Sequence, residues 1–349
     1  MEIMTAKTML NCLKCSLIAL FMLNFQVLKA QADFAGIDEI IKQNQKAIGN
    51  EVAILVSQEG KTVYSREIPE FRIKNPAPLH ESSRWLTAAI VMIFVDEGKI
   101  SLDDKVGKYL PILEKYSKGY ITIRQCLANT TGIEADATGV LKLTQRHRFA
   151  SLEEEVNMFV SKREIVDNAG TAYFYSNIGT NMAARVLEIV GKKGFDRLAQ
   201  EKLFRPLSMR NTSFYSEKGA VDPSGGANGS AVDFMNFLNM LMNKGMFNGK
   251  KILSEESVEF LLTKPFTDQP VKYIPKSMAS YTPLPGAWIE EADGAGKPLV
   301  ISSPGFAGPL PWINFARNYA AIILPLKELS EEKTLPIQAI RREIDSHVK

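Results

Sequence analysis

Apolar residues near the start of the chain follow first a helical spacing and then a strand pattern. Four of them recur as on one face of a helix: Phe34, Ile37, Ile41 and Ile48. Two β-rich runs, 51–57 and 61–66, come next and are joined by the turn-forming residues 58–60. This part of the sequence therefore predicts an amphipathic helix followed by a β-hairpin.

The middle of the chain has a helical pattern. Residues 86–95 are apolar on every side, which is typical of a helix buried all round, and Gly98 provides a good stop. Thr122 can cap a short helix, and Ser151 with Glu154 has the spacing of a capping box. Three further stretches are expected to be helical: 177–190, 195–204 and 233–243.

The last third returns to strands and ends in a helix. The expected strands are 287–291, 299–302, 312–315 and 319–324, and the expected helix is 337–347. Strands at both ends of the chain thus flank a helical region, which predicts an α+β fold with an antiparallel sheet, terminal helices flanking it and a mostly helical lobe. The sheet lobe would comprise 33–80 and 285–349, and the helical lobe roughly 81–284. We expect any cleft to lie between the two lobes.

The first 32 residues have the pattern of a secretory signal peptide. Lysines precede an apolar core at 17–28, and Ala30-Gln31-Ala32 offers small residues to a signal peptidase. An uncleaved anchor is the alternative, but Asn24 and Gln26 interrupt the apolar run. We therefore expect a secreted or periplasmic protein that begins at Asp33 and has no membrane span after cleavage.

Charge and cysteine content narrow the functional classes further. The formal net charge is +3, and cleavage of the signal peptide would leave a mature chain of about +1. So small a charge does not indicate nucleic-acid binding. Cys126 alone remains in the mature chain and is expected to be a small buried residue. The histidines lack metal-ligand spacing, and we find no phosphate loop or dinucleotide fingerprint. We therefore expect no metal and no cofactor.

Two short segments carry candidate chemistry. Tyr175-Ser176-Asn177 lies just before an expected helix, where a tyrosine and an asparagine two residues apart can point into one cleft. Ser303-Pro304-Gly305-Phe306 separates two expected strands, and its glycine allows a ligand or another backbone to approach closely. Each signal is weak alone, since the first pattern is common by chance and the second also suits a hairpin turn.

Taken together and in this order, the segments resemble the serine β-lactamase and penicillin-binding protein superfamily, in particular the branch of class C β-lactamases, D-Ala-D-Ala carboxypeptidases and esterases. The resemblance runs from about Leu79 to Pro325. Segments outside the candidate site also carry it: 85–88, 95–104, 109–111, 121–133, 206–209 and 248–249. It implies the β-lactamase/transpeptidase fold and a serine hydrolase active site.

The first motif that the resemblance implies, Ser-x-x-Lys, is degenerate here. Its serine position holds Glu81 and its lysine position holds Arg84. Arginine stays protonated and cannot accept the nucleophile's proton, and glutamate cannot form the usual serine ester. Ser82 and Ser83 are adjacent, but each helical residue turns the side chain by about 100°, and neither serine has a lysine three residues later.

The second motif is intact and the third is not. The resemblance implies that Tyr175 would be the general acid or base and that Asn177 would contact a substrate amide. The third motif, Lys/His-Thr/Ser-Gly, aligns with Ser303, Pro304 and Gly305, so its cation is lost. The family's oxyanion hole uses two backbone N–H groups, which map to Glu81 and to Phe306 just after the glycine.

Two functional hypotheses follow. The first is a pseudoenzyme that binds a small peptide, cell-wall fragment or protein partner. The alternative is an active serine hydrolase of esterase, carboxypeptidase or β-lactamase type, acting on an ester-like or peptide ligand through Ser82 or Ser83. Because Glu81 and Arg84 are three residues apart on one helix, we also expect them to form an ion pair. The sequence leaves the oligomeric state open.

Overall fold

The fold was analysed in a computed structural model of the chain, which describes residues 34–135, 149–216, 219–264, 269–329 and 335–348. The signal peptide expected at 1–32 lies outside the described residues. No described helix is long and apolar enough to cross a membrane.

A seven-stranded sheet organises the molecule, in the order β2-β1-β13-β12-β11-β10-β9, with every neighbouring pair antiparallel. Its strands are β1 (Val52–Gln58), β2 (Lys61–Arg66), β9 (Thr282–Leu284), β10 (Ala287–Ala292), β11 (Pro298–Ser302), β12 (Leu310–Asn314) and β13 (Tyr319–Pro325). The expected α+β architecture is confirmed. In the pairing of β1 with β13, Val52 lies opposite Pro325 and Gln58 opposite Tyr319, so an early and a late segment of the chain lie side by side in the sheet.

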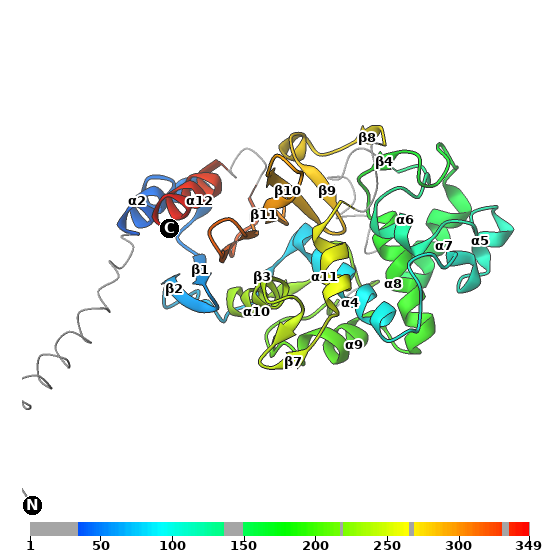
Figure 1. Cartoon of the computed structure of the whole chain (residues 1–349), viewed down its shortest axis with the longest axis horizontal. Coiled ribbons are helices and arrows are strands. Elements are labelled where there is room, and N and C mark those ends of the chain that lie inside the picture. Colours follow the sequence, from blue (N-terminus) through cyan, green and yellow to red (C-terminus); the bar gives the residue numbers. More distant parts are fainter. Residues whose placement is uncertain (1–33, 136–148, 217–218, 265–268, 330–334, 349) are drawn as a thin grey trace, which may run out of the picture.

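The alternation of side chains along β1 explains how the sheet is covered on both faces. Val52, Ile54 and Val56 belong to a core shared with the terminal helices, whereas Ala53 and Leu55 belong to the core of the helical region. The terminal helices are α2 (Ala35–Gln43), α3 (Gln45–Ile48) and α12 (Leu335–His347). Figure 1 shows α2 and α12 side by side at one end of the molecule. The sequence predicted one N-terminal helix, but the chain breaks it at Asn44.

Helix α4 (Ser83–Asp96) runs through the centre of the helical region, as its apolar sequence predicted. Every residue from Ser83 to Phe94 is buried. A 3₁₀ turn, His80–Ser82, leads into it. The surrounding helices are α5 (Ile112–Lys115), α6 (Ile123–Leu127), α7 (Leu152–Lys162), α8 (Ile178–Gly191), α9 (Phe195–Ala199), α10 (Ala231–Met242) and α11 (Glu255–Leu262), with 3₁₀ turns at Val106–Lys108 and Lys276–Met278.

Several local features differ from the sequence-based expectation. The helix expected at 195–204 is a short α9 followed by a π-helical turn, Gln200–Phe204. Thr122 forms a full capping box, but the Glu154 carboxylate accepts from the Ala150 N–H and not from Ser151. Helix α11 and strand β9 were not predicted. The short strands β3 (Ala77–Pro78), β4 (Tyr173–Phe174), β5 (Asn228–Gly229), β6 (Met246–Phe247), β7 (Lys250–Lys251) and β8 (Val271–Tyr273) pair in twos.

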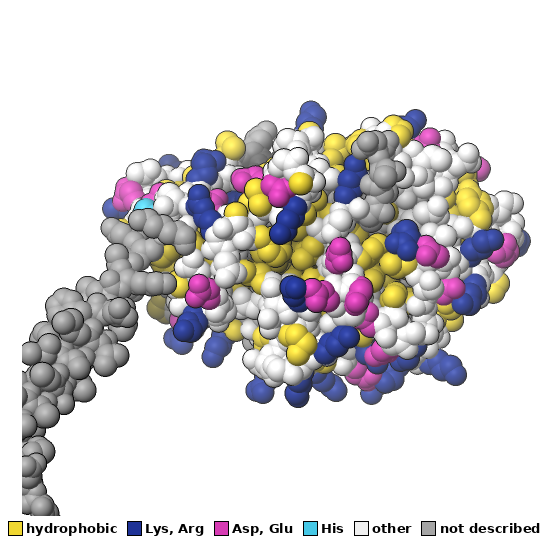
Figure 2. Space-filling view, in the orientation of Figure 1, with side chains coloured by type: hydrophobic (Ala, Val, Ile, Leu, Met, Phe, Trp, Pro, Cys, Tyr) yellow, Lys and Arg dark blue, Asp and Glu magenta, His cyan; other side chains and the backbone are white. Residues whose placement is uncertain are grey.

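The surface carries charges of both signs. On the face shown in Figure 2, Lys and Arg side chains gather along the lower edge, below the positions of α9 and β7 in Figure 1, while acidic side chains are scattered over the rest. Apolar side chains are visible in the middle of this face.

Candidate functional site

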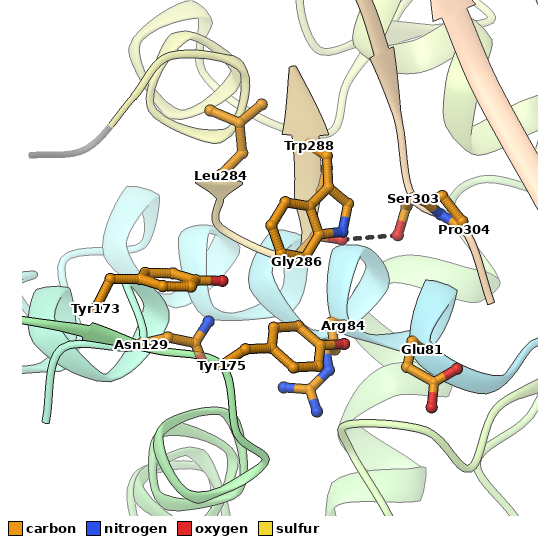
Figure 3. Close-up of a pocket in the computed structure, with 11 residues that line it drawn as sticks. Glu81, Arg84, Asn129, Tyr173, Tyr175, Leu284, Gly286, Trp288, Ser303 and Pro304 are labelled. Atoms are coloured by element: carbon orange, nitrogen blue, oxygen red, sulfur yellow. Dashed lines mark hydrogen bonds between the residues drawn. The ribbon is translucent and has the colours of Figure 1, made fainter. Parts of the chain in front are cut away.

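A small pocket lies where the start of α4, the segment before α8 and the strands β10 and β11 meet (Figure 3). Its lining residues are Glu81, Arg84, Asn129, Tyr173, Tyr175, Leu284, Gly286, Ala287, Trp288, Ser303 and Pro304. The side chains leave only about 10 Å³ for the centres of water-sized molecules, which is roughly the room that one water needs. Pockets for organic ligands usually measure about 300–1,000 Å³, so the protein's own side chains largely fill this one.

Glu81 places its carboxylate on a backbone donor of the expected oxyanion hole. Its Oε2 atom accepts a hydrogen bond from the Phe306 N–H over 2.9 Å. The residue before it, His80, has a φ of +47°, in the left-handed region that non-glycine residues rarely adopt. This turn of the chain directs Glu81 toward the loop that follows β11.

Gly305 allows the two distant segments to approach this closely. A Cβ on Gly305 would lie 3.0 Å from the Leu79 carbonyl oxygen and 3.2 Å from the His80 Cβ. Its own N–H donates to the Pro309 carbonyl over 2.8 Å, which closes a tight loop. Gly305, the glycine of the third motif, therefore allows Phe306 to lie close to the start of α4.

Arg84 is held by groups other than Glu81. Its Nη1 donates to the Ser176 carbonyl over 2.6 Å and lies 3.4 Å from the Thr180 Oγ1. The guanidinium carbon is 4.5 Å from the centroid of the Tyr175 ring, a cation–π distance. The expected Glu81–Arg84 ion pair is wrong: the two side chains take different partners, and Figure 3 shows Arg84 beneath Tyr175 with Glu81 to one side.

Tyr175 lies between these charges and an aromatic wall. Its ring centroid is 5.6 Å from that of Trp288 and 5.8 Å from that of Phe306. Burial raises the pKa of the Tyr175 phenol well above its usual value; the nearby Arg84 cation opposes this rise and the Glu81 carboxylate adds to it. The phenol is therefore protonated at neutral pH and can donate a hydrogen bond, but it is a poor acceptor of a proton.

The other residue of the second motif, Asn177, takes the N-cap position of α8 without a side-chain hydrogen bond to the helix. It is not among the residues that line the pocket. Asn129 lines it instead, and its Oδ1 lies 3.4 Å from the Ser176 N–H that donates to it. Asn129 has a φ of +54°, and asparagine tolerates this conformation better than most residues.

Ser303 uses its polar groups inside the protein. Its hydroxyl donates to the Gly286 carbonyl over 2.7 Å, as drawn in Figure 3, and its carbonyl accepts from the Ser82 hydroxyl. Pro304 follows directly and lines the pocket. The position of the family's cation therefore stabilises the backbone between β10, β11 and the start of α4.

Ser82 and Ser83 are both fully buried, with no exposed surface. The Ser82 hydroxyl is committed to Ser303, and the Ser83 Oγ accepts from the Ala227 N–H over 3.0 Å. Neither serine lines the pocket. Both hydroxyls satisfy buried backbone groups, which is a structural task.

Sequence reasoning missed Trp288, Tyr173 and Gly286 as pocket residues. Gly286 has a φ of +79°, and a Cβ there would lie 2.5 Å from backbone atoms of Arg84 and Trp85. The turn between β9 and β10 therefore touches α4 directly. The only sequence signal for these pocket residues was Gly286, a glycine just before an expected strand. Trp288 could not be told from an ordinary core residue. Among the described residues, no cluster of three His, Cys, Asp or Glu side chains could hold a metal.

The family model described as Beta-lactamase matches residues 37–325. This chain belongs to the β-lactamase family. Protein flp of Staphylococcus aureus (strain N315) is 26% identical over an alignment of 190 residues, which covers 51% of this chain and 38% of that protein. Beta-lactamase-like protein 2 of Dictyostelium discoideum is 25% identical over an alignment of 205 residues, which covers 53% of this chain and 36% of that protein. The match thus spans less than half the length of either relative.

Solved structures agree with the fold. A Bacteroides dorei protein with a provisional β-lactamase name superposes with a TM-score of 0.79 at 25% identity, covering 91% of this chain and 99% of that one. An octameric penicillin-binding protein homologue from Pyrococcus abyssi gives 0.72 at 17% identity, covering 89% and 77%. The D-alanine carboxypeptidase AmpC from Burkholderia cenocepacia gives 0.65 at 18%, covering 89% and 96%. The β-lactamase/transpeptidase-like fold expected from the sequence is confirmed.

Proposed function

We propose that this protein is an exported, non-catalytic member of the β-lactamase family that binds a ligand without cleaving it. The observation that carries the proposal is the hydrogen bond from the Phe306 N–H to the Glu81 carboxylate. An oxyanion hole works because its donors are free to stabilise the negative charge that develops in the transition state. Here the Glu81 carboxylate of the chain itself already accepts from one of these donors.

The remaining groups fit this proposal. The first motif offers a carboxylate in place of the hydroxyl and a guanidinium in place of the amine, so both nucleophile and proton acceptor are lost. The protonated Tyr175 phenol cannot replace the amine as a base at neutral pH. Each step from nucleophilic attack to proton transfer therefore lacks its group.

The alternative, a hydrolase that uses Ser82 or Ser83, has less support. Both serines are inaccessible and hydrogen-bonded to backbone groups, so attack on a substrate would require α4 to open at its first turn. Such an opening would also break the contact between the β9–β10 turn and Arg84.

The binding role rests on two partly buried aromatic side chains: Tyr175 lines the pocket, and the ring of Phe306, which is not a lining residue, packs against it. Aromatic faces next to backbone donors suit a small peptide, a cell-wall fragment or a segment of a protein partner. The signal-like pattern of residues 1–32 supports the proposal that the protein meets such a ligand outside the cytoplasm.

Covalent labelling tests the proposal. The mature chain is incubated with a penicillin and with a fluorophosphonate, and intact-mass spectrometry measures the adduct. We expect no adduct on wild type, and slow acylation of the triple variant Glu81→Ser, Arg84→Lys, Ser303→His, because it regains a nucleophile, a base and a cation at family spacing.

A matched control adds Ser82→Ala and Ser83→Ala to the wild-type chain. The proposal is supported if neither the wild-type chain nor this control acquires an adduct. An adduct that peptide mapping places on wild-type Ser82 or Ser83 would overturn it, whatever the triple variant does.

A further inference from the structure

The small net charge of the chain conceals an uneven distribution. Residues 189–215 and 244–251 together contain nine lysines and arginines but only two acidic residues, so they carry +7 in a chain whose formal net charge is +3. The rest of the chain is therefore net acidic. Eight of the nine cations are exposed, whereas the two acids, Asp196 and Glu201, are only partly exposed. The surface of these two segments is thus strongly positive.

Helix α10 connects the two segments on one side of the molecule. Near its start, the Asp233 carboxylate accepts from the Asn211 N–H over 2.6 Å, and after its end the Asn243 side chain donates to the Met246 carbonyl over 3.2 Å. The helix has 12 residues and spans about 18 Å. Figure 2 shows the cations along one edge, below α9 and β7 of Figure 1. We call the exposed cations of the two segments the basic edge.

Much of the charge on the basic edge is unpaired. Lys193 and Arg197 pair with Glu201, and Lys244 pairs with Glu255. In the part of the chain that the structure describes, five exposed cations have no acidic side chain within ion-pair distance: Lys192, Arg205, Arg210, Lys250 and Lys251. Exposed cations that share one surface repel one another, so an anionic partner would be attracted to this edge.

Two exposed apolar side chains lie beside the same cations. Ile189 is 40% exposed and Tyr215 is 67% exposed. Ile189 follows Glu188, whose Oε1 accepts from the Phe195 N–H at the start of α9 over 2.9 Å. Tyr215 follows Phe214, whose ring centroid lies 5.0 Å from that of Phe195. Exposed tyrosines near lysines and arginines are typical of surfaces that meet the headgroups of a lipid bilayer.

We propose that the basic edge binds the anionic headgroups of a lipid bilayer, with Tyr215 and Ile189 at the headgroup level. The proposal goes beyond ligand binding at the pocket and does not rest on it. Headgroup phosphates neutralise the cations, and the apolar boundary beneath them accepts the two apolar side chains, which a soluble polyanion would leave in water. Each lysine or arginine near such a surface contributes about fivefold in affinity, so five unpaired cations suffice for reversible binding.

Co-sedimentation of the mature chain with vesicles tests the proposal. We expect binding to vesicles of equal parts phosphatidylcholine and phosphatidylglycerol at about 50 mM salt and its loss at about 500 mM, because salt screens exposed charges. Vesicles of phosphatidylcholine alone should bind no protein. Lys250→Ala combined with Lys251→Ala should weaken binding about tenfold or more. The matched control, Lys42→Ala with Lys46→Ala, removes the same charge from exposed positions on α2 and α3 and should keep the wild-type affinity.

Tyr215→Ser distinguishes a bilayer from a soluble polyanion. We expect it to weaken vesicle binding about threefold or more and to leave binding to dextran sulfate unchanged, because that polymer has no apolar region for the ring. A wild-type chain that ignores the anionic vesicles, or a Lys250 and Lys251 double variant that binds them like wild type, would overturn the proposal. Vesicle binding that Tyr215→Ser leaves unchanged would overturn the bilayer in favour of a polyanion. The replaced side chains are all exposed, so the variants should keep their fold.

Discussion

At the scale of single residues, Glu81 and Arg84 show what sequence reasoning could and could not reach. Their positions on the family motif were readable, because Trp85 and the residues after it fix the alignment. Their partners could not be predicted from the sequence. A spacing of three residues on a helix favours a mutual ion pair, but such a pair contributes only about 0.2–0.5 kcal/mol, so other contacts easily outweigh it. Backbone groups of Ser176 and Phe306, from distant segments, provide partly buried hydrogen bonds instead.

Cys126 gives a prediction at the same scale. Burial raises the pKa of its thiol from about 9 to about 12, and the side chain has no exposed surface. Iodoacetamide at about pH 8 should therefore modify it only as fast as the protein unfolds, because the thiolate is the reactive form. Mass spectrometry over a denaturant series measures the rate. Rapid modification of the native protein would contradict the buried position.

The sign of the pH effect follows from the raised pKa. The folded state binds the thiol proton more tightly than the unfolded state, so the stabilisation is fully present below about pH 9 and is lost as the pH rises toward about 12. At the pH of the labelling experiment the thiol therefore does not weaken the fold.

At the scale of elements, periodic patterns predicted the long helices and inner strands, and contacts decided the rest. The four inner strands of the last third and the central helix follow from apolar runs with clear ends. Strand β9 is three residues long and contains a proline, so nothing local marks it. It is a strand because β10 pairs with it and the tight turn at Gly286 brings both against α4.

Gly286→Ala tests that contact. The new Cβ would lie 2.5 Å from the backbone of Arg84 and Trp85, and alanine is strained at a φ of +79°. We expect a loss of about 2 kcal/mol or more in the free energy of unfolding, measured by urea denaturation. Gly294→Ala is the matched control, because its Cβ meets nothing within 4 Å and its φ is not in the left-handed region. A control loss as large as that of Gly286→Ala would contradict the assigned cause.

At the scale of the whole molecule, the C-terminal helix is tied to the sheet by a buried ion pair. Arg341 on α12 and Glu290 on β10 are 7% and 8% exposed, with Nη1 and Oε2 2.5 Å apart. The same guanidinium lies 5.4 Å from the ring centroid of Trp312 on β12. The sequence predicted a terminal helix, but nothing in it links Arg341 to Glu290, because the two residues lie some fifty positions apart.

Replacing one member of this pair should be costly. Arg341→Met leaves Glu290 buried and unpaired, for which we expect a loss of about 3–5 kcal/mol in the free energy of unfolding. Adding Glu290→Met should recover much of it, since two apolar side chains need no partner. Lys244→Met, which breaks an exposed pair with Glu255, should change stability far less, because water screens an exposed ion pair. Thermal unfolding of wild type and the three variants measures these differences. A loss with Arg341→Met no larger than that with Lys244→Met would contradict a stabilising role of the Arg341–Glu290 ion pair.

The pairing of β1 with β13 determines when the central sheet can form during folding. The strand that emerges early, Val52–Gln58, finds its long partner only when Tyr319–Pro325 has appeared. Closing so long a loop costs entropy before any contact rewards it, so the sheet should form late and slowly. Until then the apolar face of the β1–β2 hairpin is uncovered and open to aggregation. For the exported protein proposed above, this delay would keep the chain unfolded until the last strand has crossed the membrane.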